Sequence, residues 1–305
     1  MRRDSKYGLF SIIYLLVRRF IVVKTLYRGK YDTPNRSVFV PSTMEQKYTI
    51  VDLYCGAGGV GLALDDISTE YEIDIEHIGI DIEDHHDTYP GNFVQGDCSD
   101  PEWLDAMLPN DIDLLWLSPP CTAYSTLSYA NKHELGFDDP RDHYPTIDDL
   151  NVHEVIDRLD PDEYIIENVA TCEDLREPAK LNGLAFDEPY DLERHFETSF
   201  DAPNNVVTGE PSVPLTTVSD DSQSQSAKPI ARAKGVPEDW GSQVIRSAIP
   251  RSYVQYLLHY CPVVDVPLPT AAAPKQTLWS DYTARGHPLR DILTIARRAV
   301  RGVGI

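Results

Sequence analysis

A strand, a glycine-rich loop and a helix follow one another between residues 48 and 66, and this succession constrains the fold most. The apolar run 48–54 predicts a strand, Cys55-Gly-Ala-Gly-Gly59 a tight turn, and residues 60–66 a helix. Further predicted strands lie at 77–81, 93–95, 112–117 and 164–167, and further helices at 103–108, 147–159 and 251–260. Strands that alternate with helices at this spacing predict an α/β fold with a doubly wound, mostly parallel sheet.

The charge of the chain is strongly negative and unevenly distributed. The net charge is −22 over 305 residues, yet residues 1–47 carry ten Lys/Arg against three Asp/Glu, and residues 275–305 carry six against two. The acidic middle should repel phosphates at low salt, because nucleic-acid binding replaces counterions with Lys and Arg. We interpret the acid excess as adaptation to high salt in a haloarchaeon or its virus, which leaves nucleic acid open as a partner.

The five cysteines form no C-x-x-C pair and are odd in number. This pattern argues against a disulfide framework or a zinc cluster, so we expect a reducing, cytoplasmic setting and no metal. The apolar run 7–17 is too short to span a membrane. We expect residues 1–47 to form an N-terminal extension, and we interpret residues 1–43 as lying outside the enzyme core, as a mis-assigned upstream start would. The alternative is a peripheral membrane anchor.

Polar groups follow the predicted strands at the end where ligands of such sheets bind. The glycine turn lets a ligand approach the backbone, and Asp81 at the end of the second strand could accept from ribose hydroxyls. Asp97 at the end of the third could accept from an adenine amino group. Each acid alone is equally well a loop or cap residue, but all three features in order indicate an adenosine-containing cofactor.

Two further strand ends carry candidate catalytic side chains. Cys121 follows two prolines that stiffen its loop, and a thiol becomes a nucleophile where its surroundings favour the thiolate. Glu167 ends the fifth strand, where burial could keep its carboxyl protonated. The alternatives are an inert buried cysteine and a surface acid.

Three motifs together resemble those of the cytosine-5 DNA methyltransferases: Asp52-Leu-Tyr-Cys-Gly-Ala-Gly-Gly59, Pro120-Cys121 with Ser125, and Glu167-Asn-Val169. The stretches 175–183, 194–198 and 248–253 are similar to the short forms found in phages and prophages. The resemblance covers about residues 48–260. It implies a Rossmann-like fold, S-adenosylmethionine as the cofactor and double-stranded DNA as the substrate.

The resemblance also assigns roles to single residues. Cys121 would attack carbon 6 of a flipped cytosine and make carbon 5 accept the methyl group, while Glu167 would protonate N3 and Arg194 would hold O2. Asn168 and Ser125 would complete the catalytic set. The cofactor would be held by Tyr54, Gly56, Gly58, Asp81, Ile82, Asp97 and Pro119.

The sequence departs from the family pattern in the glycine loop, in the arginine motif and in the region expected to recognise DNA. Tyr54 replaces the usual Phe, and the arginine motif is reduced to Arg194. We expect residues 48–200 to form the catalytic domain, and the polar loop 201–230 to stand in for a target-recognition domain. Sequence specificity should then be short, relaxed or supplied from elsewhere. Residues 231–262 would complete the catalytic domain.

Residues 263–305 would form a linker and a basic amphipathic tail. Residues 288–300 would either contact phosphates or form a solvated helix. The segment 276–282 (Gln276 to Tyr282) faintly resembles a sliding-clamp-binding peptide, so a weak clamp contact is a candidate; we otherwise expect a monomer without membrane contact.

Three rival functions are weighed against the DNA methyltransferase. An RNA cytosine-5 methyltransferase would share the scaffold, and a degenerate, non-catalytic DNA- or cofactor-binding relative would explain the eroded arginine motif. A nicotinamide dehydrogenase needs G-x-G-x-x-G, which the glycines at 56, 58, 59 and 61 do not match.

Overall fold

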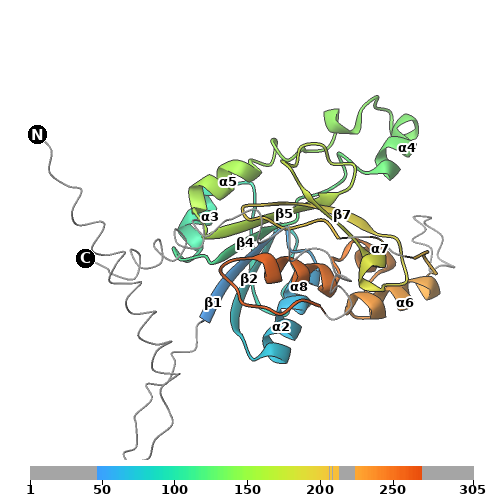
Figure 1. Cartoon of the computed structure of the whole chain (residues 1–305). Coiled ribbons are helices and arrows are strands. Elements are labelled where there is room, and N and C mark those ends of the chain that lie inside the picture. The colour runs from blue at the N-terminus through green and yellow to red at the C-terminus, as the bar shows by residue number, and fades with distance from the viewer. Residues whose placement is uncertain (1–46, 206, 208, 213–223, 270–305) are drawn as a thin grey trace, which may run out of the picture. The chain divides into compact units, whose positions relative to one another are not determined.

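A computed structural model describes residues 47–205, 207, 209–212 and 224–269. Its centre is a seven-stranded sheet in the order β3-β2-β1-β4-β5-β7-β6 (Figure 1). The strands are β1 (Lys47–Leu53), β2 (Asp74–Asp81), β3 (Asn92–Gln95), β4 (Leu114–Leu117), β5 (Glu163–Val169), β6 (Ala179–Asn182) and β7 (Glu193–Thr198). The first five strands run parallel, whereas β7 is antiparallel to β5 and to β6. The predicted α/β class with a doubly wound, mostly parallel sheet is confirmed.

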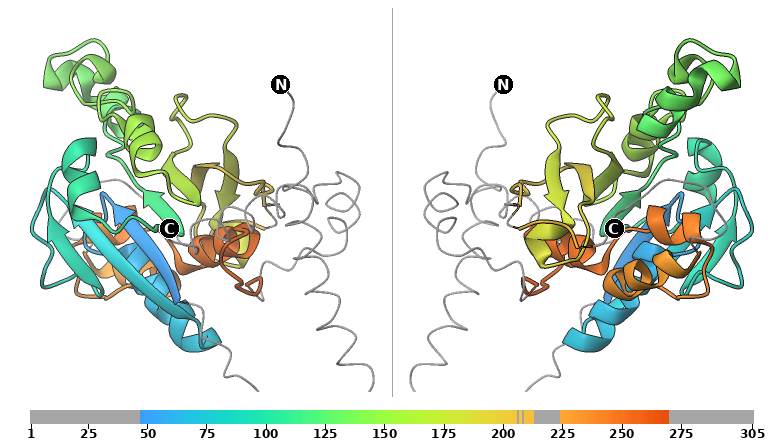
Figure 2. Two further views of the ribbon diagram at one scale, coloured as in Figure 1. Left: turned by 90° about the vertical axis from the view of Figure 1, so that its left-hand side faces the viewer. Right: turned by 90° about the vertical axis from the view of Figure 1, so that its right-hand side faces the viewer.

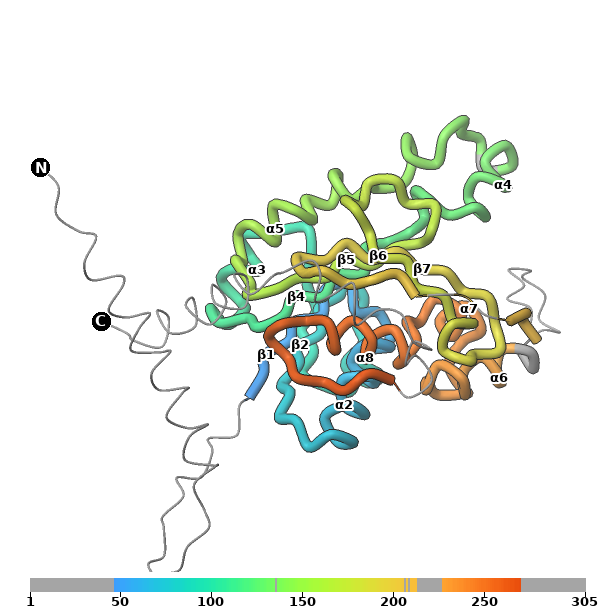
Figure 3. Tube along the Cα trace, viewed as in Figure 1, coloured from blue at the N-terminus to red at the C-terminus, as the bar shows by residue number. Residues whose placement is uncertain are grey.

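Helices cover both faces of the sheet. α2 (Gly59–Tyr71) and α8 (Arg251–Tyr260) pack together on one face, and α3 (Pro101–Met107) and α5 (Val152–Leu159) on the other (Figure 3). α4 (Thr126–Leu135) and the short helix η1 (Pro140–Asp142) lie on a segment that projects from the sheet (Figure 2). α6 (Ser224–Lys234) and α7 (Ser242–Ser247) pack on each other, and η2 (Gly183–Phe186) follows β6.

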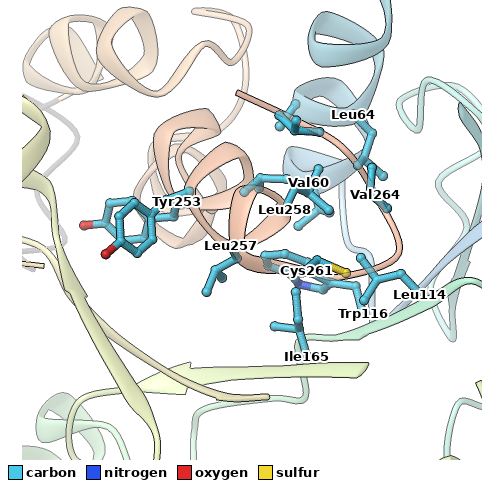
Figure 4. Packing of buried hydrophobic residues seen from close by; sticks show 14 of the residues in the cluster. Val60, Leu64, Leu114, Trp116, Ile165, Tyr253, Leu257, Leu258, Cys261 and Val264 are labelled. Carbon is cyan, nitrogen blue, oxygen red and sulfur yellow. The ribbon is translucent and has the colours of Figure 1, made fainter. Parts of the chain in front are cut away.

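The two faces form separate apolar cores because strand side chains alternate between them. In β4, Trp116 lies in the cluster that includes α2 and α8, while its neighbours Leu115 and Leu117 lie in the cluster with α3 and α5. Figure 4 shows Trp116 surrounded by Leu257, Cys261 and Ile165. A parallel sheet covered on both faces explains why these strands read as continuous apolar runs in the sequence.

Several expected elements differ from the structure. The helix expected over 147–159 begins only at Val152, because residue 151 has a left-handed backbone (φ 52°) and residues 147–150 form turns. The loop expected through residue 230 is helical from Ser224 onward, as part of α6. The linker expected from 263 starts within the core, since Val263, Val264 and Val266 are buried there.

Other expectations lie outside the described residues: the N-terminal extension up to residue 46, the clamp-like segment 276–282 and the basic tail helix 288–300. Within the described ranges, no helix has the length and apolar character needed to cross a membrane.

We predict that Gly79→Ala lowers the stability of the domain. An added Cβ at this position of β2 would lie 2.5 Å from the ring of Tyr89, which is itself buried against Gly58 and Gly61. Overpacking of this kind costs about 1–3 kcal/mol in the free energy of unfolding, measurable by denaturant titration. Gly241→Ala is the control, because its nearest neighbour lies at 4.0 Å. Equal stability of the two variants would contradict the packing.

Candidate active site

The candidate residues meet at the carboxyl ends of the parallel strands. The strand order reverses beside β1, whose neighbours in the sheet are β2 and β4. Open α/β sheets bind their ligands outside such a switch point. The structure therefore brings the glycine loop, Asp81, Asp97, Cys121 and Glu167 to one edge of the sheet.

The loop between β1 and α2 is held against the end of β2. The Cys55 amide donates to the Ile80 carbonyl (3.1 Å) and the Gly56 amide to Asp81 Oδ2 (2.9 Å). Gly58 has a left-handed backbone (φ 96°), and a Cβ there would lie 2.8 Å from Pro90 Cδ. Only glycine satisfies both constraints, which explains the glycine at this point of the loop.

The loops that follow β2 and β3 are hydrogen-bonded to each other. The Gly96 amide donates to the Asp81 carbonyl (2.9 Å), and the Gln95 side chain donates to the Ile82 carbonyl (3.0 Å). The Ile82 side chain is 68% exposed between these polar groups. Asp97 Oδ1 accepts from the amide and the hydroxyl of Ser99. An exposed apolar side chain flanked by two carboxylates fits a planar base attached to a ribose.

Tyr54 lies next to this cofactor-side group. Its backbone is left-handed (φ 57°), its amide points at Cys98 Sγ (3.3 Å), and its hydroxyl is 3.5 Å from the Leu150 carbonyl. The ring thereby links the glycine loop to the segment before α5.

Cys121 lies in the loop after β4, which Asn168 of β5 holds in place. Asn168 is buried, and its Nδ2 donates to the carbonyl of Pro119 (3.2 Å). The amides of Tyr124 and Ser125 both donate to the Cys121 carbonyl. The Ser125 hydroxyl accepts from the amides of residues 127 and 128, so in this structure it caps α4.

The thiol of Cys121 is half-buried, whereas the other four cysteines are buried. Burial raises the pKa of Cys121, the carboxyl of Glu167 raises it further, and the guanidinium of Arg194 opposes them. The pKa of the thiol therefore depends on the charges of the Glu167–Arg194 pair as well as on its burial.

Glu167 and Arg194 form a buried ion pair, with 3.0 Å between Arg194 Nε and Glu167 Oε1. Arg194 on β7 is opposite Val169, two residues beyond Glu167 on β5, so both side chains lie on the same face of the sheet. Burial raises the pKa of Glu167, and Arg194, Ser118 and Lys234 in turn lower it. The pKa of this carboxyl is therefore set by its burial against the neighbouring positive charges and the Ser118 hydroxyl.

Sequence reasoning missed Lys234, whose side chain is 1% exposed and whose charge acts on Glu167. A signal was present: Ala227, Ile230, Ala231 and Lys234 recur at helical spacing, and the first three are buried. Among the described residues, no group of three or more His, Cys, Asp or Glu side chains is arranged to hold a metal ion.

We predict that Glu167→Gln lowers the pKa of Cys121. The substitution removes the negative charge that raises this pKa and leaves the opposing charge of Arg194. The rate of alkylation by iodoacetamide, followed by peptide mapping, should show its midpoint at lower pH in the variant than in the wild type. Glu173→Gln, at an exposed acid of the next loop, is the control. An unchanged midpoint would show that the two groups are not coupled.

Comparisons with known proteins locate the resemblance along the chain. Residues 48–184 match the family model described as C-5 cytosine-specific DNA methylase. A search of curated proteins found no match.

Among solved structures, the chain is similar to the Entamoeba histolytica methyltransferase EhMeth, at 10% identity over 71% of this chain and 98% of that chain, with a TM-score of 0.48. It is also similar to the CMeT domain of the citrinin polyketide synthase, at 12% identity over 51% of this chain and 34% of that chain (TM-score 0.27). A third similar structure is the complex of the Haloferax volcanii Trm112 methyltransferase activator with a putative methyltransferase, at 19% identity over 41% of this chain and 46% of the other (TM-score 0.23). The stretch 48–184 that is similar to this family also contains the three motifs of the glycine loop, Cys121 and Glu167.

Proposed function

We propose that this chain transfers a methyl group from S-adenosylmethionine to carbon 5 of cytosine in double-stranded DNA. The observation that supports it most is that the glycine loop, the Cys121 loop and Glu167 of the Glu167–Arg194 pair lie at the carboxyl ends of the neighbouring strands β1, β4 and β5, with the charges of the pair acting on the thiol. A nucleophile and a carboxyl of adjustable protonation are what addition to a pyrimidine ring requires. The family whose model matches residues 48–184 methylates the same carbon.

The cofactor side of the site has features that fit S-adenosylmethionine. Ile82 offers an exposed apolar surface for the adenine, and Asp81 and Asp97 offer carboxylates for the ribose and the amino group. Gly56 has open space where a Cβ would stand, and Gly58 allows the loop to turn closely against Pro90. Pro119 and Tyr54 would close the methionine end. The cofactor supplies an electrophilic methyl group when it is bound.

The base side of the site accounts for the remaining steps. A cytosine must leave the duplex to reach Cys121. The thiol proton passes to water as the sulfur adds to carbon 6, and the electrons of the C5–C6 double bond move onto carbon 5 and, by conjugation, towards N3. Glu167 gives its proton to N3, and Arg194 holds O2, so that negative charge does not build up on the ring. After methylation, the proton on carbon 5 passes to water, the C5–C6 double bond forms again as Cys121 leaves, and N3 returns its proton to Glu167.

The effect of the Glu167 charge on the Cys121 thiol gives a reason why the base should bind before the sulfur attacks. The negative charge of Glu167 raises the pKa of Cys121. When the carboxyl is protonated and donates to N3, that charge disappears from the surroundings of the sulfur. Binding of the correct base therefore favours the thiolate, and the thiol stays unreactive until then.

The test of the proposal is transfer of labelled methyl from S-adenosylmethionine to unmethylated DNA, from low salt to multimolar KCl. We expect incorporation as 5-methylcytosine, absent in Cys121→Ala, and highest at high salt, because screening weakens repulsion between the acidic body and phosphates. Cys172→Ala, at a buried cysteine outside the site, is the matched control. Cofactor binding without incorporation into DNA would contradict the proposal and favour RNA as substrate or a non-catalytic role, which labelled RNA would separate.

We also expect Asp81→Asn to weaken binding of S-adenosylmethionine by about tenfold, or 1.4 kcal/mol. The variant removes the negative charge of the side chain that accepts a hydrogen bond from the Gly56 amide and would accept hydrogen bonds from the ribose hydroxyls. Equilibrium dialysis without DNA measures the effect. Asp84→Asn is the control, since Asp84 is exposed and its carboxylate bonds to the amide and the ring of His86. Equal affinity of both variants would exclude Asp81 from the cofactor site.

A further inference from the structure

A buried lysine connects two parts of the candidate site. Lys234 is the last residue of α6, and its Nζ donates to the carbonyls of Arg246 and Ala248, each at 2.7 Å. Arg246 lies in the last turn of α7, and Ala248 is the residue that ends this helix. The ammonium therefore satisfies carbonyls that the helix end leaves without intrahelical partners.

The segment that Lys234 holds packs against the first residue of α2. A Cβ placed on Gly59 would lie 3.2 Å from Ala248 Cβ and 3.3 Å from the Ile249 amide nitrogen. Gly59 directly follows the glycine loop, whose Gly56 amide is bonded to Asp81. A shift of residues 246–249 would therefore reach the loop on the cofactor side.

The charged groups that face Lys234 come from the base side. Burial lowers the pKa of Lys234 to about 7, and the charge of Arg194 on β7 lowers it as well. The carboxyls of Glu188, between η2 and β7, and of Glu167, on β5, raise it. The ring centroid of Tyr190 lies 5.8 Å from Nζ. α7 faces the ammonium with its two carbonyls. In return, Lys234 lowers the pKa of Glu167 and of Glu188.

We propose that Lys234 is a positioning residue for methyl transfer, which holds residues 246–248 against the start of α2 and places a switchable positive charge beside the Glu167–Arg194 pair. The role at the base side rests on the proposed function, whereas the role at the cofactor side requires only that S-adenosylmethionine binds. Lys234 touches neither ligand in this assignment; it acts through the segment and through the ion pair.

The first test is binding of S-adenosylmethionine to the full chain without DNA. Lys234→Met should weaken binding by at least about tenfold, because two charge-assisted hydrogen bonds are lost. Lys234→Gln keeps two N–H donors without the charge, and its affinity should lie between those of the wild type and Lys234→Met. Lys228→Met on the exposed side of the same helix is the control, with unchanged affinity. Thermal unfolding of each variant shows whether it folds. If Lys234→Met does not fold, the comparison of Lys234→Gln with the wild type decides the test.

The second test is the pH dependence of single-turnover methyl transfer, which a purely structural role would not alter. Lys234 is charged below pH 7 and neutral above it, given its pKa of about 7. While charged it lowers the pKa of Glu167, so the wild-type rate should show an inflection near that pH. Lys234→Met and Lys234→Gln should both lack it, and Lys228→Met should keep it.

The outcomes separate this proposal from the proposed function. If the wild type binds S-adenosylmethionine but methylates nothing, the proposed function fails and the binding comparison still decides the role of Lys234. If Lys234→Met binds as tightly as Lys228→Met and keeps the inflection, the positioning role is overturned and the proposed function stands. A wild type that binds no S-adenosylmethionine would overturn both.

Discussion

The site depends on the buried ion pair between Glu167 and Arg194. It joins the parallel part of the sheet to its antiparallel edge, and its 3.0 Å separation follows from the pairing of Val169 with Arg194. Removing water from two charges is costly, and losing one partner leaves the other uncompensated. The pair is therefore weak evidence for stability and stronger evidence that the charges are kept for another reason. Burial raises the pKa of Glu167 and of the nearby Cys121 thiol, and the charge of Arg194 opposes both shifts.

The sheet places the chemistry through its strand order. Because the five parallel strands end at one edge, loops far apart in the chain contact one another there, as Asn168 does with Pro119 and Asp81 with Gly56. Each of these two contacts joins a side chain at the end of one strand to a backbone group of the neighbouring loop. The cofactor side and the base side of the site are thereby fixed by neighbouring strands.

Recognition of a large acidic partner must overcome the charge of the body. Several basic side chains of the described core are already paired with acids: Lys47 with Glu76, Arg158 with Asp105, Arg232 with Glu238 and Arg251 with Glu70. Within the described core, such pairs offset part of the positive charge that could face phosphates, and salt screens the remaining repulsion. Between β7 and α8, the described part of the chain provides two short helices, α6 and α7, which present few side chains for reading bases.

The sequence by itself determined the parallel half of the sheet, since apolar strands alternate there with glycine turns and amphipathic helices, and each period is local. It also placed Cys121, Glu167, Asp81 and Asp97 at strand ends, because motifs of this kind lie at fixed offsets from the strands. It did not determine β6 and β7, whose short antiparallel pairing depends on partners distant in the chain. The tertiary structure alone decided that Arg194 meets Glu167, that Ser125 caps α4, and that Lys234 is buried. Register, burial and the field of neighbouring charges arise only when separate segments pack, and they set the protonation states on which the chemistry depends.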